Sequence, residues 1–192
     1  TIENNVSRLE AVGAAAIQIE DQTTDRRCGH LSDKQVVSQS EMTERIHAAC
    51  EGRKSTDTIV IARTDVRGVT SMEDCLSRME AYHIAGADWI FPEALHSKEE
   101  FAEAGRLLQE LKVPGLANMT EFGHSPLLSR KKLSDLGFAA VLYPVTLLRL
   151  AMKAIEVGLG VLADEESQQS ILDLMQTREE LYDLLDYDPS HP

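Results

Sequence analysis

The chain has 192 residues, of which 43% are hydrophobic and 27% are charged, the composition of a globular protein with a single core or slightly more. Its formal net charge of −13 argues against a nucleic-acid partner, because binding to phosphates requires a basic surface. No apolar run approaches the roughly 20 residues of a membrane-spanning helix, so no membrane partner is expected. The three cysteines fit neither a disulfide framework nor a Cys-x-x-Cys zinc pattern, which favours a reducing cytoplasm.

Helical patterns begin the chain and recur along it. Apolar residues recur at helical spacing from Ile2 to Val12, and Gly13 then ends the helix. Later helices are expected to begin at a Ser or Thr that caps the first turn, often with an acidic residue three positions on. These starts are Ser38, Ser71, Ser97, Ser129 and Thr177. A long helix is also expected from about residue 145 to residue 163.

Five short apolar runs between these helices are expected to be strands. They cover residues 14–21, 58–65, 88–94, 114–121 and 139–144. Runs that are apolar throughout, instead of alternating with polar residues, are typical of parallel strands covered by helices. Five such strands with intervening helices predict an α/β fold, either an open doubly wound sheet or a barrel.

The ends of the expected strands favour the barrel. No Gly-x-Gly-x-x-Gly motif follows any strand, so a dinucleotide-binding open sheet has no support. Each strand ends in residues capable of chemistry, which a barrel gathers at one mouth. We therefore predict the last five βα units of a (β/α)8 barrel of the TIM type over residues 1–163. A C-terminal helical segment is expected over residues 164–192. The barrel is partial, because a complete one needs about 250 residues.

The most informative stretch follows the first strand and reads Asp-Gln-Thr-Thr-Asp-Arg-Arg-Cys-Gly-His, from Asp21 to His30. Two arginines precede Cys28, and nearby cations stabilise a thiolate. Gly29 permits close approach of a substrate. A loop cysteine without a function is the alternative, but polar neighbours on all sides favour a reactive Cys28.

Arginine and carboxylate residues at other strand ends point to an anionic substrate. Arg63 ends an apolar strand, where a charge requires an anionic partner. Guanidinium groups bind carboxylates with two parallel hydrogen bonds and stay charged when desolvated. For Arg178, on a helix, a solvated surface position is the more common role. Glu20 could equally pair with one of the arginines before Cys28.

Several segments resemble the isocitrate lyase/phosphoenolpyruvate mutase superfamily, over nearly the whole chain. The matching segments are residues 13–22, Arg26 to His30, Ile61 to Asp65, Phe91 to Ala94, Leu116 to Gly123, Leu142 to Pro144 and Met175 to Tyr182. Phosphonate-forming mutases lack the Cys-Gly-His motif. Isocitrate lyases carry a serine-rich motif with tryptophan where this chain has Asn-Met-Thr-Glu-Phe-Gly-His-Ser-Pro. The segments are most similar to the methylisocitrate lyase branch.

The resemblance implies an oxo-acid lyase that cleaves 2-methylisocitrate, a tricarboxylate, to pyruvate and succinate. Cys28 would be the general acid that protonates the carbanion form of succinate, and His30 would orient and tune its thiol. Mg²⁺ is the implied cofactor, with Glu20 in its outer shell through water. The implied substrate contacts are Cys28, Gly29, Arg63, Glu93, Asn118, Met119, Thr120, Arg149 and Arg178.

The resemblance also implies parts that the sequence lacks. Members of the superfamily hold Mg²⁺ through an Asp-x-Asp on an earlier strand, and no such motif occurs here before the first strand. We therefore expect the chain to be a fragment that is inactive alone and prone to aggregate. The parent enzyme is expected to be a homo-oligomer, a dimer of dimers, in which the last helices swap onto a neighbour.

Two alternatives remain open beside this activity. The first is a related lyase or decarboxylase that acts on substituted malates or oxaloacetate. The second is a non-catalytic half-barrel module. Retention of Cys28, Arg63, Glu93 and Asn118 together argues against the module, because a scaffold needs none of these groups.

Overall fold

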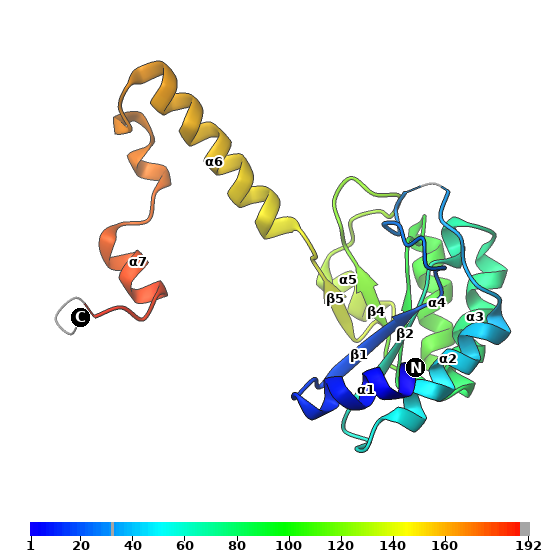
Figure 1. The fold of residues 1–192 in the computed structure, drawn as a ribbon. Helices are drawn as coiled ribbons and strands as arrows, with labels where there is room; N and C mark the ends of the chain where they lie inside the picture. Colours follow the sequence, from blue (N-terminus) through cyan, green and yellow to red (C-terminus); the bar gives the residue numbers. More distant parts are fainter. Residues whose placement is uncertain (32, 189–192) are drawn as a thin grey trace. The chain divides into compact units, whose positions relative to one another are not determined.

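The structure is a computed structural model that describes residues 1–31 and 33–188. It divides into two compact units, Thr1–Pro144 and Val145–Pro192. Each unit is described below by itself (Figure 1). The division falls before the long helix that the sequence analysis included in the last βα unit. The predicted domain boundary at residue 163 stays a prediction.

The first unit contains five parallel strands whose spatial order follows the chain. They are β1 (Ala16–Glu20), β2 (Ile59–Thr64), β3 (Trp89–Pro92), β4 (Leu116–Asn118) and β5 (Ala140–Leu142). One sheet has the order β1-β2-β3, and β4 pairs with β5. A single parallel bridge between Ile90 and Gly115 connects β3 with β4. The prediction of an α/β fold with parallel strands is confirmed.

Helices separate these strands and begin where the sequence places a capping residue. They are α1 (Ile2–Ala11), α2 (Gln39–Gly52), α3 (Met72–Ile84), α4 (Lys98–Leu111) and α5 (Arg130–Asp135), with a 3₁₀ turn, η1 (Val66–Gly68), after β2. The side chains of the serines before α2, α3, α4 and α5 each accept a hydrogen bond from the third helical amide. These bonds satisfy amides that the helix leaves without partners, and so fix where each helix begins.

The core of the first unit lies between the sheet and the helices α2, α3 and α4, which lie side by side in Figure 1. Its largest fully buried side chains include Ile46, Tyr82, Phe101 and Leu108. Burial of each apolar side chain of this size contributes about 1.5–3 kcal/mol. A smaller cluster around Val6 and Val60 packs α1 and α2 against β1 and β2. The packed face holds the carboxyl ends of the strands in fixed positions.

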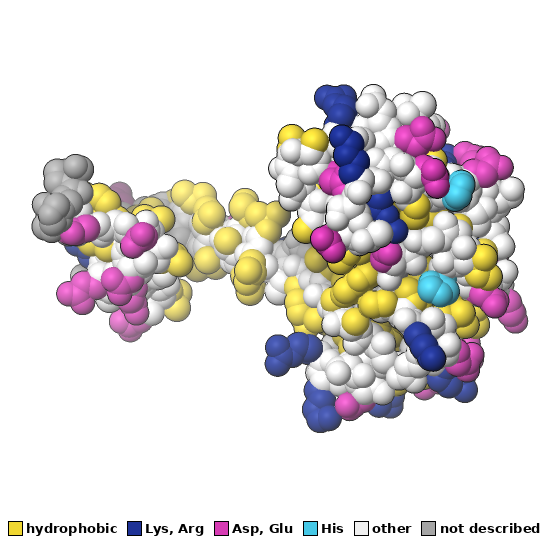
Figure 2. All heavy atoms as spheres, turned by 90° about the horizontal axis from the view of Figure 1, so that it is seen from below, with side chains coloured by type: hydrophobic (Ala, Val, Ile, Leu, Met, Phe, Trp, Pro, Cys, Tyr) yellow, Lys and Arg dark blue, Asp and Glu magenta, His cyan; other side chains and the backbone are white. Residues whose placement is uncertain are grey.

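The second unit consists of α6 (Thr146–Glu165), a 3₁₀ turn, η2 (Gln169–Leu174), and α7 (Arg178–Leu184). Thr177 and Glu180 complete a capping box at the start of α7. None of its residues from 145 to 188 is buried, and hydrophobic side chains, yellow in Figure 2, are exposed along α6. Within the described part of the chain, no helix is both long and apolar enough to cross a membrane.

Candidate active site

Polar side chains from four strand ends meet at one edge of the first unit. Glu20 ends β1, Arg63 lies one residue before the end of β2, Glu93 follows β3, and Asn118 ends β4. Arg63 NH1 lies 3.2 Å from Glu93 Oε2. Asn118 Nδ2 donates to both oxygens of Glu93 at 3.2 Å. Parallel strands place their carboxyl ends at the same edge, which is why residues so far apart in sequence come together here.

Arg63 is the cationic centre of this group and is only 8% exposed. Its Nε and NH2 atoms donate to the two oxygens of Asp65 at 2.8 and 2.9 Å. The guanidinium also lies over the ring of Phe91, 5.1 Å from its centroid. Burial alone would lower the pKa of Arg63, but the surrounding carboxylates raise it above its usual value. The group therefore stays charged in a desolvated position, as binding of a carboxylate substrate requires.

The loop between β1 and α2 carries Cys28, Gly29 and His30 to this edge. Gly29 is buried, and a Cβ atom there would lie 2.5 Å from Glu93 Cγ and 2.6 Å from Arg63 NH2. Only glycine fits at that distance without displacing these side chains. The neighbouring Cys28 is a free, exposed thiol. The loop backbone therefore lies directly against the Arg63–Glu93 pair.

His30 connects this loop to Glu93 and to the loop after β4. Its Nε2 lies 2.9 Å from Glu93 Oε1, and its Nδ1 accepts a hydrogen bond from the backbone amide of His124 at 3.1 Å. Nε2 is buried and close to this carboxylate, but the two groups do not meet the geometry of a hydrogen bond. Burial would raise the pKa of Glu93, but His30, Arg63 and Asn118 together hold it below its usual range. Glu93 is therefore an anion at neutral pH.

Two further predicted contacts follow β4. Met119 is 2% exposed, and its amide donates to the carbonyl of Leu142 at 2.9 Å. A backbone contact from Met119 to a substrate would therefore use its carbonyl oxygen. Thr120 is partly exposed beside it. Their contact with substrate stays a prediction.

Arg149 and Arg178 belong to the second unit, on α6 and at the first position of α7, and both are exposed. Their convergence with Arg63 on one substrate stays a prediction. The first unit, by contrast, brings together Glu20, Gly29, His30, Arg63, Glu93 and Asn118.

Glu20 is the only predicted contact to the metal. Its Oε1 accepts a hydrogen bond from Arg26, whereas its buried Oε2 accepts none and lies 3.5 Å from Arg63 Nε. Within residues 1–31 and 33–188, no group of three or more His, Cys, Asp or Glu side chains is arranged to hold a metal ion. The described residues therefore do not form a Mg²⁺ site by themselves, although the Glu20 carboxylate fits a contact through water.

Three further residues support this edge: Asp21 and Asp65, which the sequence places at strand ends, and Lys34, which it did not identify. Lys34 Nζ lies 3.7 Å from Asp65 Oδ1, and both side chains are almost fully buried. Asp21, directly after β1, is fully buried and accepts hydrogen bonds from Thr64, Tyr82 and Arg78. An isolated loop lysine gives no sequence signal of burial, because Asp65, the carboxylate that pairs with it, lies 31 residues away in the sequence.

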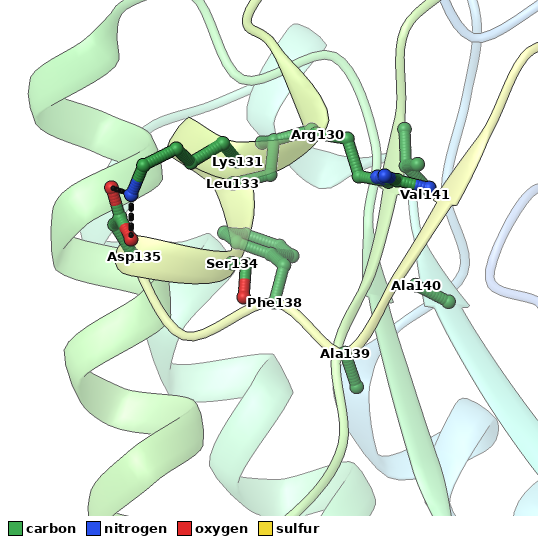
Figure 3. A pocket seen from close by; sticks show the side chains of 9 residues that line it. All are labelled: Arg130, Lys131, Leu133, Ser134, Asp135, Phe138, Ala139, Ala140 and Val141. Carbon is green, nitrogen blue, oxygen red and sulfur yellow. Dashed lines mark hydrogen bonds and ion pairs between the residues drawn. The ribbon is translucent and has the colours of Figure 1, made fainter.

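A separate pocket of about 440 Å³ lies at α5 and β5 and contains none of the predicted site residues (Figure 3). Lys131 and Asp135, four residues apart on α5, form an ion pair at 3.2 Å. Ala139, Ala140 and Val141 line the side formed by the last strand. This pocket lies at the start of β5, whereas the candidate active site lies at the carboxyl ends of the strands.

Comparison with known proteins gives a consistent family. The family model described as phosphoenolpyruvate phosphomutase matches residues 1–160. A 2-methylisocitrate lyase from Aeropyrum pernix is 45% identical over 186 residues, which are 97% of this chain and 59% of that protein. A 2-methylisocitrate lyase from Halalkalibacterium halodurans is 48% identical over 182 residues, 94% of this chain and 58% of that protein. The chain thus spans about three-fifths of the length of these relatives.

Solved structures agree with the sequence comparison. A 2,3-dimethylmalate lyase, described as a PEP mutase/isocitrate lyase superfamily member, has a TM-score of 0.82 and 32% identity, covering 96% of this chain and 61% of that chain. An oxaloacetate acetylhydrolase in complex with 3,3-difluorooxalacetate has a TM-score of 0.80 and 31% identity, covering 98% of this chain and 67% of that chain.

Proposed function

This chain belongs to the phosphoenolpyruvate phosphomutase family, within the PEP mutase/isocitrate lyase superfamily, and on that premise we propose the activity of the whole protein. We propose that it is a carbon–carbon lyase that cleaves 2-methylisocitrate to pyruvate and succinate. The sequence identity of 45–48% to proteins named 2-methylisocitrate lyase supports the proposal over 94–97% of this chain. These relatives extend well beyond the matched region, so the activity concerns the whole protein.

We also propose that the first unit forms part of a (β/α)8 barrel. Its five strands are all parallel and keep their chain order from β1 to β5. Doubly wound sheets reverse strand order at a switch point, whereas barrels add each strand next to the previous one. The polar strand ends at one edge match the face where barrel enzymes carry their active sites.

The observation that carries the proposed function is the packing of Gly29 against Arg63 and Glu93. It places the Cys-Gly-His segment over a buried cation that suits a carboxylate. Arg63 would bind a substrate carboxylate through its guanidinium, and Asn118 would accept a hydrogen bond from a substrate hydroxyl through Oδ1. Asn118 Oδ1 is buried without a hydrogen-bond partner among the described residues, as expected of a group that waits for a ligand.

Cys28 would act as the general acid of the cleavage. The carbon–carbon bond breaks with its electron pair left on the succinate half, as a carbanion beside a carboxylate. The Cys28 thiol donates its proton to that carbon, while the substrate hydroxyl gives up its proton to solvent and becomes the keto oxygen of pyruvate. Exposure of Cys28 allows solvent to return the proton to the thiolate. His30, fixed between Glu93 and the His124 amide, would orient the segment.

Mg²⁺ is proposed as the cofactor of the whole protein, but no step above depends on it. The residues that the structure describes supply only the Glu20 carboxylate toward such an ion. A contact of Glu20 through water is the role that fits Oε2, which accepts no hydrogen bond from the described residues.

A homo-oligomer, a dimer of dimers with exchanged C-terminal helices, is proposed for the whole protein. Exposed hydrophobic side chains along α6, among them Leu147, Leu150 and Leu159, support it. Apolar surface of this kind is commonly covered by another chain.

The test of the proposed function is a substrate panel with the whole protein. We expect 2-methylisocitrate to yield pyruvate and succinate in equal amounts, and Cys28→Ser to lower turnover by about 100-fold or more, the range for loss of a general acid. Cys50→Ser is the matched control, because the Cys50 thiol donates to the Gly86 carbonyl, between α3 and β3, and its turnover should match the parent. Preference for a substituted malate or oxaloacetate, with no succinate formed, would reject the proposed substrate. Full turnover by Cys28→Ser would reject the acid assignment.

A further inference from the structure

Lys34 is the one lysine that the described structure buries, with its side chain 1% exposed. It lies in the loop between β1 and α2, six residues after Cys28. Its Nζ donates a hydrogen bond to the carbonyl of Gly29, and lies 3.7 Å from Asp65 Oδ1. Burial of an ammonium group costs free energy unless charged and polar partners compensate it. The two partners of Lys34 are the Gly29 carbonyl and the Asp65 carboxylate, so Lys34 connects these two groups.

Asp65 links Lys34 to the site. The same carboxylate accepts two hydrogen bonds from Arg63, at 2.8 and 2.9 Å. Asp65 therefore lies between two cations, one from the Cys28 loop and one from the strand that carries the substrate-binding arginine. Through this carboxylate, the position of the loop and the position of the Arg63 guanidinium depend on each other.

Gly68 shows how closely Lys34 fits. A Cβ atom at Gly68, in the turn η1 after Asp65, would lie 2.5 Å from Lys34 Nζ and 2.8 Å from its Cε. A methyl group added at Gly68 would therefore displace the Lys34 ammonium from its position beside Asp65.

We propose that Lys34 is a positioning residue for the reaction. By tying the Gly29 carbonyl to Asp65, it fixes the backbone of the Cys28–His30 segment against the Arg63–Glu93 pair. The catalytic part of this inference rests on the proposed function, whereas the anchoring part can be measured without any turnover.

The kinetic test uses the whole protein with Lys34→Met, Lys34→Arg and Gly68→Ala. We expect Lys34→Met to lower kcat by about 100-fold with a much smaller change in KM, since loss of positioning by about 1 Å has an effect of this size. Lys34→Arg keeps the charge and should restore part of kcat. Gly68→Ala should reproduce the loss, because it displaces Nζ without removing the lysine.

The matched control is Lys98→Met, which replaces an exposed lysine at the start of α4. It should keep the parent kcat. If Lys34→Met and Gly68→Ala also keep it in an active enzyme, the positioning role is wrong.

Hydrogen exchange separates failure of this inference from failure of the proposed function. In Lys34→Met, amides of residues 24–31 should exchange faster, while those of β2 stay unchanged, whichever substrate the protein uses. Unchanged exchange of the loop would refute the anchor. Faster exchange in both segments would show that Lys34 supports folding in general, and would also overturn the proposal.

Discussion

The two compact units differ in what covers their apolar side chains. In the first unit every helix has at least one fully packed position, such as Ile46 of α2 or Leu108 of α4. In the second unit no described residue is buried, although α6 is 20 residues long and rich in leucine. The first unit therefore has its own hydrophobic core. The described residues of the second unit form capped helices without one. Helices in proteins gain most of their stability from packing of an apolar face, which the described residues of the second unit do not provide.

The largest expected difference between the units is the loss of unfolding free energy when a paired charge is removed. Arg78 NH1 donates to Asp21, to the Val37 carbonyl and to Tyr82, at 2.9–3.1 Å. Burial already raises the pKa of Asp21. Arg78→Met would leave that carboxylate buried and unpaired, so we expect the free energy of unfolding to fall by about 3–5 kcal/mol. Urea unfolding followed by the fluorescence of Trp89, the single tryptophan, measures this in the first unit.

The counterpart in the second unit is Lys153→Met. Lys153 pairs with Glu156 at 2.7 Å, but both side chains are 70% exposed. The free energy of unfolding should not change measurably, because solvent and salt screen such a pair. If the two substitutions had equal effects, the contrast between a packed and an unpacked unit would be wrong.

Two helical glycines test the same contrast by adding a methyl group. At Gly105 of α4 a Cβ would lie 1.8 Å from the carbonyl oxygen of Leu136, so α4 would have to move away from the C-terminal end of α5. Gly105→Ala should therefore destabilise the first unit by about 1–3 kcal/mol, the usual cost of overpacking. Gly160→Ala in α6 meets no atom within 4 Å, and should instead stabilise that helix by about 0.5–1 kcal/mol. Thermal unfolding followed by circular dichroism measures both; a loss at Gly160 would mean that α6 is packed closely after all.

The sequence predicted the elements well where local patterns determine them. Capping serines placed the starts of α2, α3, α4 and α5 correctly, since an N-cap bond forms between residues three apart. The expected strands were too long at the later positions, where β4 covers only Leu116–Asn118 and β5 only Ala140–Leu142. Apolar character extends past the last paired residue there, and pairing depends on the neighbouring strand, not on hydrophobicity.

The site was predictable where a polar or charged residue lies at the end of an apolar strand. Arg63, Glu93 and Asn118 were identified that way, and the structure places them within hydrogen-bonding distance. Lys34 and Arg78 were missed, because their burial depends on Asp65 and Asp21, which lie 31 and 57 residues away in sequence. Chain patterns report local periodicity and carry no information on such distant pairs.

The smallest expected effect appears only in acid. Because the pKa of Glu93 is below its usual range in the folded state, its contribution to stability is complete above the unfolded value of about 4.3 and is lost as the pH falls through the lowered pKa. Glu93→Gln removes this group, so the melting temperature should fall less than in the parent as the pH is lowered from about 5 to about 2. Glu180 in the second unit also has a lowered pKa, from its bonds to Thr177, but it is fully exposed. Glu180→Gln should therefore leave the acid dependence of the first unit, followed at Trp89, unchanged. A change as large as that of Glu93→Gln would show that the two units unfold together, and that the second shares the core of the first.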